Sequence, residues 1–109
     1  MSEDKNKQPL DRKRIAKMRT IGHSLKPVVI VGSKGLSENV LEEIQRALDD
    51  HELIKVKLAV GNRDIKRKFI NEMCEATGAE LVQSIGNIAL IFRKALKPKP
   101  QYSNLERFK

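Results

Sequence analysis

The order of apolar and polar residues predicts seven secondary-structure elements in the middle of the chain. Apolar residues recur at helical spacing in three stretches, and four shorter runs rich in Val, Ile and Leu read as strands. In chain order they are a helix from residue 11, a strand at 28–31, helices at 37–48 and 64–77 with a strand at 53–60 between them, and strands at 81–85 and 88–93. The order αβαβαββ predicts a single α/β domain, with helices packed on a mixed four-stranded sheet.

The strands differ in their pattern. The run at 28–31 is apolar at every position, which predicts an interior strand. In the next strand, Ile54, Val56 and Leu58 alternate with Lys55 and Lys57, so the two lysines are expected on an open face of the sheet. There they either meet a ligand phosphate or serve solubility alone, and the pattern favours neither.

The last two strands are separated by Gly86 and Asn87, a two-residue turn that predicts a hairpin. Pairing Ile85 with Ile88 puts the bulky residues on the core face of the sheet with Gln83 as the exception. That face is expected to carry Leu81, Ile85, Ile88, Leu90 and Phe92.

The loop between the first strand and the second helix carries the main candidate chemistry. It reads Gly32, Ser33, Lys34, Gly35, and Ser37 follows as a helix N-cap. Two glycines let a backbone approach closely, the helix start attracts anions, and the lysine adds a charge, so the pattern predicts a phosphate-contacting loop. A plain chain-reversing turn is the alternative. Neither the Walker A spacing nor GxGxxG is present.

Charge favours a polyanionic partner. The formal net charge is +8, and the excess lies in the two ends of the chain. The first helix has an apolar side with Ile15, Met18 and Leu25, and five basic residues without an acid between positions 12 and 19. Those five are Arg12, Lys13, Arg14, Lys17 and Arg19.

The ends lack periodic apolar residues, so we expect a flexible tail at 1–9, a domain at 10–93 and a flexible basic tail at 94–109. Cys74 is the only cysteine and falls in a helical apolar stripe, which predicts a buried thiol. Metal-ligand spacings, paired catalytic groups and membrane-length apolar runs are all lacking in the sequence. We therefore expect a cytoplasmic protein that is neither an enzyme nor a cofactor binder.

Four segments together resemble the CRM (chloroplast RNA splicing and ribosome maturation) domain, in particular the stand-alone bacterial YhbY-type proteins. They are residues 25–29 (LKPVV), 32–41 (GSKGLSENVL), 52–57 (ELIKVK) and 82–86 (VQSIG). The resemblance spans about residues 10–93. It implies an RNA-binding domain with a GxxG loop like that of KH domains, a fold akin to the C-terminal domain of translation initiation factor three, and association with RNA of large-ribosomal-subunit precursors. We expect the protein to be a monomer. Family members often carry a basic residue and a tyrosine where this chain has Asn87 and Phe92.

The expected function is RNA binding without catalysis. Phe92 is the only aromatic residue of the strands and is placed on the core side, which argues against base stacking on the sheet. A backbone clamp by the glycine loop with nearby cations fits better. The expected RNA contacts are Gly32, Ser33, Lys34, Gly35, Lys26, Lys55, Lys57, Arg12, Lys13, Arg14 and Lys17. The alternative is a protein interaction module whose basic ends bind an acidic partner.

Overall fold

The computed structural model describes residues 12–107. The predicted N-terminal tail at 1–9 and residue 11, where the first helix is predicted to begin, lie outside these residues. The elements are α1 (Arg12–His23), β1 (Pro27–Val31), α2 (Glu38–His51), β2 (Leu53–Leu58), α3 (Arg63–Thr77), β3 (Glu80–Ile85), β4 (Ile88–Phe92) and α4 (Asn104–Arg107).

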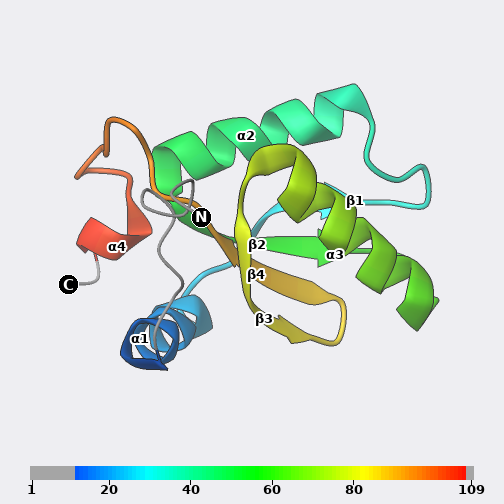
Figure 1. The fold of residues 1–109 in the computed structure, drawn as a ribbon, viewed down its shortest axis with the longest axis horizontal. Coiled ribbons are helices and arrows are strands. Elements are labelled where there is room, and N and C mark those ends of the chain that lie inside the picture. The colour runs from blue at the N-terminus through cyan, green and yellow to red at the C-terminus, as the bar shows by residue number, and fades with distance from the viewer. Residues whose placement is uncertain (1–11, 108–109) are drawn as a thin grey trace, which may run out of the picture.

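The four strands form one sheet in the order β1-β2-β4-β3. β1 and β2 are parallel, whereas β4 is antiparallel to both of its neighbours. Helices α2 and α3 pack on one face of the sheet and α1 packs on the other (Figure 1). The predicted α/β fold with a mixed four-stranded sheet is therefore confirmed, with the short helix α4 added after it.

The larger core lies between the sheet and the helix pair α2 and α3. Ile44 and Leu48 of α2 and Met73 of α3 are fully buried there, as their helical spacing predicts. The hydroxyl of Ser37 accepts a hydrogen bond from the Val40 amide and so caps α2. The cap of α3 is Asn62.

A second core lies under α1, where Met18 and Ile21 meet Leu53, Leu90 and Phe92. The helix comes so close to the sheet that a Cβ on Gly22 would lie 2.7 Å from a Leu90 methyl carbon. Phe92 is buried beneath this helix, and the Arg14 guanidinium lies 5.4 Å from the centre of its ring. The prediction that Phe92 is a core residue is confirmed.

Two predictions about strands are wrong. The strand at 28–31 is predicted to be interior, but β1 is an edge strand, because β2 is its one neighbour in the sheet. Val28 and Ile30 are accordingly 50% and 62% exposed. Leu81 is predicted to share a face with Leu90 and Phe92, but the register of β3 shifts between Leu81 and Gln83. This bulge turns Leu81 to the side of Ile91, and it lets Val82 join the core under α1.

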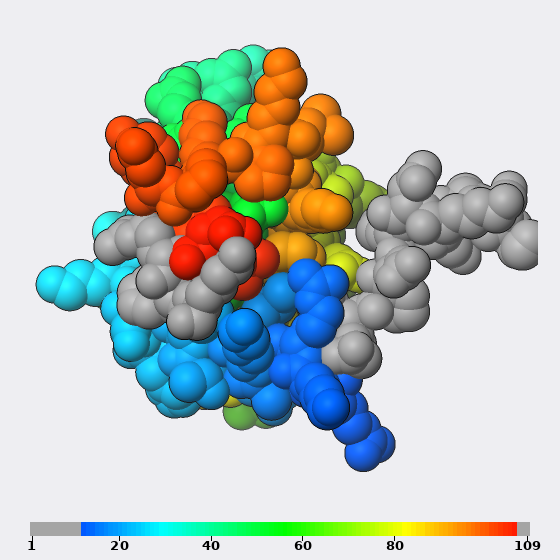
Figure 2. Space-filling view, turned by 90° about the vertical axis from the view of Figure 1, so that its left-hand side faces the viewer, coloured from blue at the N-terminus to red at the C-terminus, as the bar shows by residue number. Residues whose placement is uncertain are grey.

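The C-terminal segment is not a flexible tail over its described part. Residues after β4 cross the end of the sheet, and Ala95, Ser103 and Asn104 are buried. In Figure 2 the red end of this segment lies between α2, in green, and α1, in blue. Leu105 packs on the core under α1.

Hydrogen bonds to one buried carboxylate hold this segment. Glu52 is 4% exposed, and its two oxygens accept from the Ser103 hydroxyl at 2.6 Å and the Ala95 amide at 2.8 Å. The Asn104 side-chain amide donates to the Leu53 carbonyl at 2.6 Å. Polar anchoring of this kind leaves no apolar periodicity in the sequence, which is why the segment reads as a tail.

Ser103→Ala is expected to lower the free energy of unfolding by about 1–3 kcal/mol, because a buried carboxylate oxygen loses its donor. Urea denaturation followed by circular dichroism measures the change. Ser84→Ala, at an exposed position of β3, is the matched control and should leave the midpoint within error. Equal midpoints for the two variants would show that the segment does not hold the fold.

Among residues 12–107, no helix combines the length and the apolar character needed to cross a membrane.

Candidate functional site

The glycine loop is a tight turn with its two central side chains outside. The Gly35 amide donates to the Gly32 carbonyl at 3.0 Å, and the Ser37 amide donates to the Gly35 carbonyl at 3.2 Å. Ser33 and Lys34 are exposed. The turn therefore presents a polar tip directly before the capped start of α2.

The two glycines of the loop have different roles. Gly35 is buried, with φ of 79°, and a Cβ there would lie 3.1 Å from the ζ carbon of Phe69 in α3. Backbone conformation and close packing both require glycine at this position. Gly35 therefore seats the loop on α3.

Neither backbone conformation nor close packing requires glycine at position 32. Its φ is outside the left-handed region, and a Cβ on it would meet no atom within 4 Å. The missing side chain leaves open space on the outer side of the loop. An incoming group can approach the backbone there.

Three segments meet at the edge of the sheet that carries this loop. The loop, the start of α3 and the turn of the β3–β4 hairpin all lie on the right of Figure 1. Backbone hydrogen bonds tie the end of β2 to the end of β1 and to the hairpin turn: Ala59 donates to the Val31 carbonyl, and Leu58 donates to the Asn87 carbonyl. We call this set the loop edge, comprising residues 32–37, 61–68 and 86–87.

α3 brings cations to the loop edge that are not among the predicted RNA contacts. The first turns of α3 carry four basic residues, and the chain reads RDIKRK from residue 63 to 68. They are Arg63, Lys66, Arg67 and Lys68. This cluster was visible in the sequence, but the near-neutral charge of the central region conceals it, because six acidic residues lie between positions 38 and 52.

The basic residues of α1 do not join the loop edge. α1 covers the opposite end of the sheet, over Leu53 and Phe92. Arg12, Lys13 and Lys17 are exposed there, while Arg14 lies over the Phe92 ring. The structure thus separates the predicted contacts into two basic regions, one on α1 and one at the loop edge.

The uncovered part of the sheet lies between these two regions. Ile30, Lys57, Ile88 and Ile85 form one row across all four strands. Pro27, Lys55, Leu90 and Gln83 form the next row toward α1. Both lysines stand on the face opposite α2 and α3, and Lys57 is exposed whereas Lys55 is partly buried. The predicted open face is open only in part, because α1 packs on its Leu53 end. Lys26, just before this face, is exposed.

Two cations of the C-terminal segment, Arg93 and Lys99, form ion pairs within the protein. Arg93 donates to Asp49 at 2.6 Å and to the Thr77 carbonyl at 2.8 Å. Lys99 pairs with Asp50, and its hydrogen bond lowers the pKa of that carboxyl. In the part of the chain that the structure describes, the cations of the loop edge form no such ion pair. Positive charge is therefore offered to a partner at the loop edge and on α1, and the exposed Lys94 and Lys97 add to it in the C-terminal segment.

Cys74 is half-buried, and burial together with the charge of Glu80 raises the pKa of its thiol. A protonated thiol is a poor nucleophile, as expected for a structural cysteine. Over residues 12–107, no three His, Cys, Asp or Glu side chains gather as metal ligands would.

Comparison with known proteins identifies the family. Residues 10–93 match the CRS1 / YhbY (CRM) domain. The chain belongs to this family. The CRM match covers α1 through β4, so it includes the loop edge but not the C-terminal segment around α4.

Relatives of this CRM protein share most of its length. A Pseudomonas aeruginosa protein named "Probable RNA-binding protein" is 54% identical over 90 residues, covering 83% of this chain and 86% of its own. A Haemophilus influenzae protein named "RNA-binding protein" is 44% identical, covering 77% of this chain and 85% of its own. A Staphylococcus aureus hypothetical protein with a solution structure is 34% identical in sequence and superimposes with a TM-score of 0.71. The match covers 82% of this chain and 93% of that protein.

Proposed function

We propose that this protein binds RNA through the loop edge and acts, without catalysis, as a cytoplasmic assembly factor on precursors of the large ribosomal subunit. The observation that carries the proposal is the seating of the glycine loop on α3. It brings the turn that carries Lys34 to the same end of the sheet as the first turns of α3, which carry Arg63, Lys66 and Arg67. The backbone at Gly32 is left open beside them. The names of the relatives support RNA as the partner.

The mechanism is recognition of the phosphate backbone. Exposed cations neutralise phosphates and release counterions, while the amides of the turn and the start of α2 can donate to phosphate oxygens. Phe92, the strand aromatic, is buried, so the sheet offers no ring for stacking in the manner of an RRM. We propose that the protein binds structured or weakly sequence-selective RNA, and that it does so as a monomer.

The alternative, a module whose basic ends bind an acidic protein, is weakened by the C-terminal segment. Arg93 and Lys99 are already paired with Asp49 and Asp50, so they do not serve a partner. Over the described residues, exposed cations without an ion pair lie instead at the loop edge and on the uncovered face, as Lys34 and Lys57 do, although Lys94 and Lys97 of the C-terminal segment are exposed too.

The test is sedimentation of a cell extract at low salt, with the protein located across the ribosomal fractions. The expected result is co-sedimentation with large-subunit precursors that ribonuclease treatment abolishes. Protein that stays at the top of the gradient, or association that survives ribonuclease, would contradict the proposal.

The uncovered face provides a narrower prediction. Replacing Lys55 and Lys57 with Gln is expected to weaken binding of a precursor RNA fragment and to lower its salt slope by roughly 0.7–0.9 for each lysine that contacts phosphate. Stability should hardly change, because neither side chain makes a hydrogen bond to another described residue. Fluorescence anisotropy at several salt concentrations measures both quantities. Unchanged affinity would assign these lysines to solubility.

A further inference from the structure

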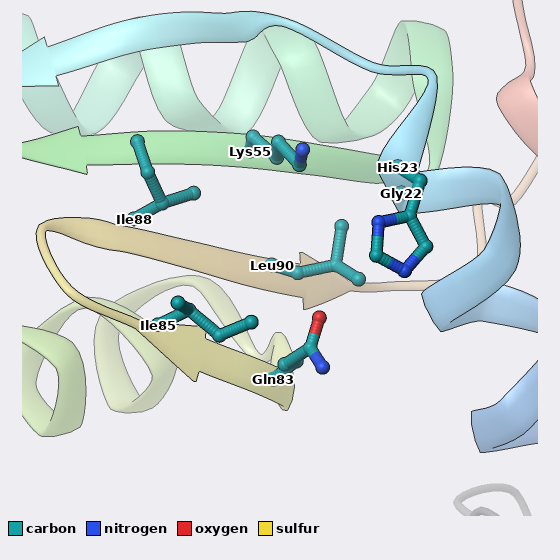
Figure 3. A pocket seen from close by; sticks show the side chains of 7 residues that line it. All are labelled: Gly22, His23, Lys55, Gln83, Ile85, Ile88 and Leu90. Carbon is teal, nitrogen blue, oxygen red and sulfur yellow. The ribbon is translucent and has the colours of Figure 1, made fainter.

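A hollow of about 170 Å³ opens on the uncovered face, beside the end of α1. Figure 3 shows its lining: Gly22, His23, Lys55, Gln83, Ile85, Ile88 and Leu90. These residues come from α1, β2, β3 and β4, so they are far apart in the sequence. The sequence analysis treated Gln83 only as an exception in an apolar pattern.

The hollow exists because α1 ends close to the sheet. Gly22 lets the last turn of α1 rest on Leu90, and His23 then borders the hollow on the right in Figure 3. The β3 bulge shifts the register so that Gln83 pairs with Leu90. The Gln83 amide is thereby on the same side of the sheet as Lys55.

The lining combines apolar walls with hydrogen-bonding groups that have no partner. Ile85, Ile88 and Leu90 give three aliphatic surfaces, and Ile85 is 61% exposed. Over the described residues, the side chains of His23, Lys55 and Gln83 form no hydrogen bond or ion pair. An amide such as that of Gln83 donates and accepts at once, which suits a group with both donors and acceptors on its edge.

The size and the charge of the hollow limit the class of ligand that it can bind. The hollow is smaller than the roughly 300–1,000 Å³ pockets of drug-sized ligands, so it suits one ring system. A phosphate would find one lysine and three aliphatic walls, a poor match beside the clustered cations of the loop edge. A planar base, apolar on its faces and polar on its edge, fits both parts of the lining.

We infer that the hollow receives one unpaired nucleobase of the bound RNA. The inference rests on the proposed function, because an RNA strand that contacts both basic regions must cross the uncovered face. Lys55 and Gln83 read the edge of the base, and Ile85, Ile88 and Leu90 contact its face. RNA with an unpaired nucleotide is therefore preferred over a perfect duplex.

The first test is an ¹H–¹⁵N NMR titration of the full chain with AMP, CMP, GMP and UMP, and with ribose 5-phosphate as the control without a base. The side-chain amide of Gln83 and the backbone amide of Ile85 are expected to shift with at least one nucleotide and not with ribose 5-phosphate. Shifts of equal size with ribose 5-phosphate, or none with any nucleotide, would overturn the inference.

The second test uses Gln83→Leu, which keeps the size of the side chain and removes its polar atoms. Wild-type protein is expected to distinguish ten-nucleotide oligomers of A, C, G and U. The variant should bind the preferred oligomer roughly three- to tenfold more weakly, the size expected for one lost hydrogen bond. Ser84→Ala, on the other side of β3, should bind as wild type does.

The outcomes separate this inference from the proposed function. If Gln83→Leu keeps both the affinity and the preference while resonances of residues 32–35 still shift with RNA, the hollow is not a base site and RNA binding at the loop edge stands. If wild-type protein binds none of the oligomers and no precursor RNA, both fall together.

Discussion

Replacing Lys34, Lys66 and Arg67 together with Gln is expected to weaken binding of a precursor ribosomal RNA fragment about 100-fold near 0.1 M salt. An exposed cation bound to phosphate contributes on the order of 1 kcal/mol to binding. Three such contacts contribute about 3 kcal/mol, which is about 100-fold in affinity. The slope of log affinity against log salt should fall by roughly 2–3. The thermal midpoint should hardly move, because the described residues show no ion pair at these side chains.

The matched control removes the same net charge elsewhere. Arg46, Lys94 and Lys97 are exposed and lie outside the loop edge, and Arg46 is on the acidic helix α2. Their combined replacement with Gln should cost far less affinity. Equal losses in the two triple variants would mean that only total charge matters and that the loop edge is no specific site.

Gly35→Asp is expected to lower the free energy of unfolding by about 2–5 kcal/mol. The left-handed φ of 79° costs a residue with a side chain about 1–2 kcal/mol, and displacing Phe69 from a 3.1 Å contact adds about 1–3 kcal/mol. Urea denaturation measures the loss, and Gly32→Asp is the control in open space. Equal stability of the two variants would contradict the different roles assigned to these glycines.

A double-mutant cycle divides the cost at Gly35 into its two causes. Phe69→Leu shortens the side chain that a new Cβ would meet, so Gly35→Ala should cost less in that background than in the wild type. The cost that remains is the backbone strain. An unchanged cost would show that the contact with Phe69 is irrelevant.

The fold could be predicted because its elements follow from local patterns. The stripe of Ile44 and Leu48 predicts α2, Ser37 predicts its start, and the alternation around Val56 predicts β2 with its lysines outward. The parallel pairing of β1 with β2 follows from the handedness of the crossover. Each of these features depends on residues close in sequence.

The errors concern contacts between distant residues. No local pattern reveals that β4 enters between β2 and β3, which leaves β1 at the edge with Ile30 exposed. The bulge at Val82 is one extra residue in a strand that still looks regular. The docking of Ser103 and Asn104 depends on Glu52 and Leu53, about fifty residues earlier.

One part of the candidate site, the glycine loop, could be predicted from the sequence, whereas the cations beside it could not. Residues 32–35 stand out as a motif, but their connection to the α3 cations through Gly35 and Phe69 is a tertiary contact. The positive charge of Arg63, Lys66 and Arg67 disappears in a sum over the central region, because it is cancelled by the carboxylates of α2, most of which follow Glu38 along that helix. Their position beside the loop only follows from the fold.

The affinity of Gly32→Ala and Gly32→Asp for a precursor ribosomal RNA fragment, at two salt concentrations, tests the central claim most directly. Both variants should melt like the wild type, because a Cβ at this position meets no atom within 4 Å. A carboxylate about 4 Å from a bound phosphate costs about 1 kcal/mol in water and about 4 kcal/mol near a protein surface. We therefore predict wild-type protein to bind best, Gly32→Ala somewhat more weakly, and Gly32→Asp at least about tenfold more weakly. Folded Gly32→Asp protein that binds as tightly as the wild type would contradict the claim that RNA phosphate meets the backbone of this loop.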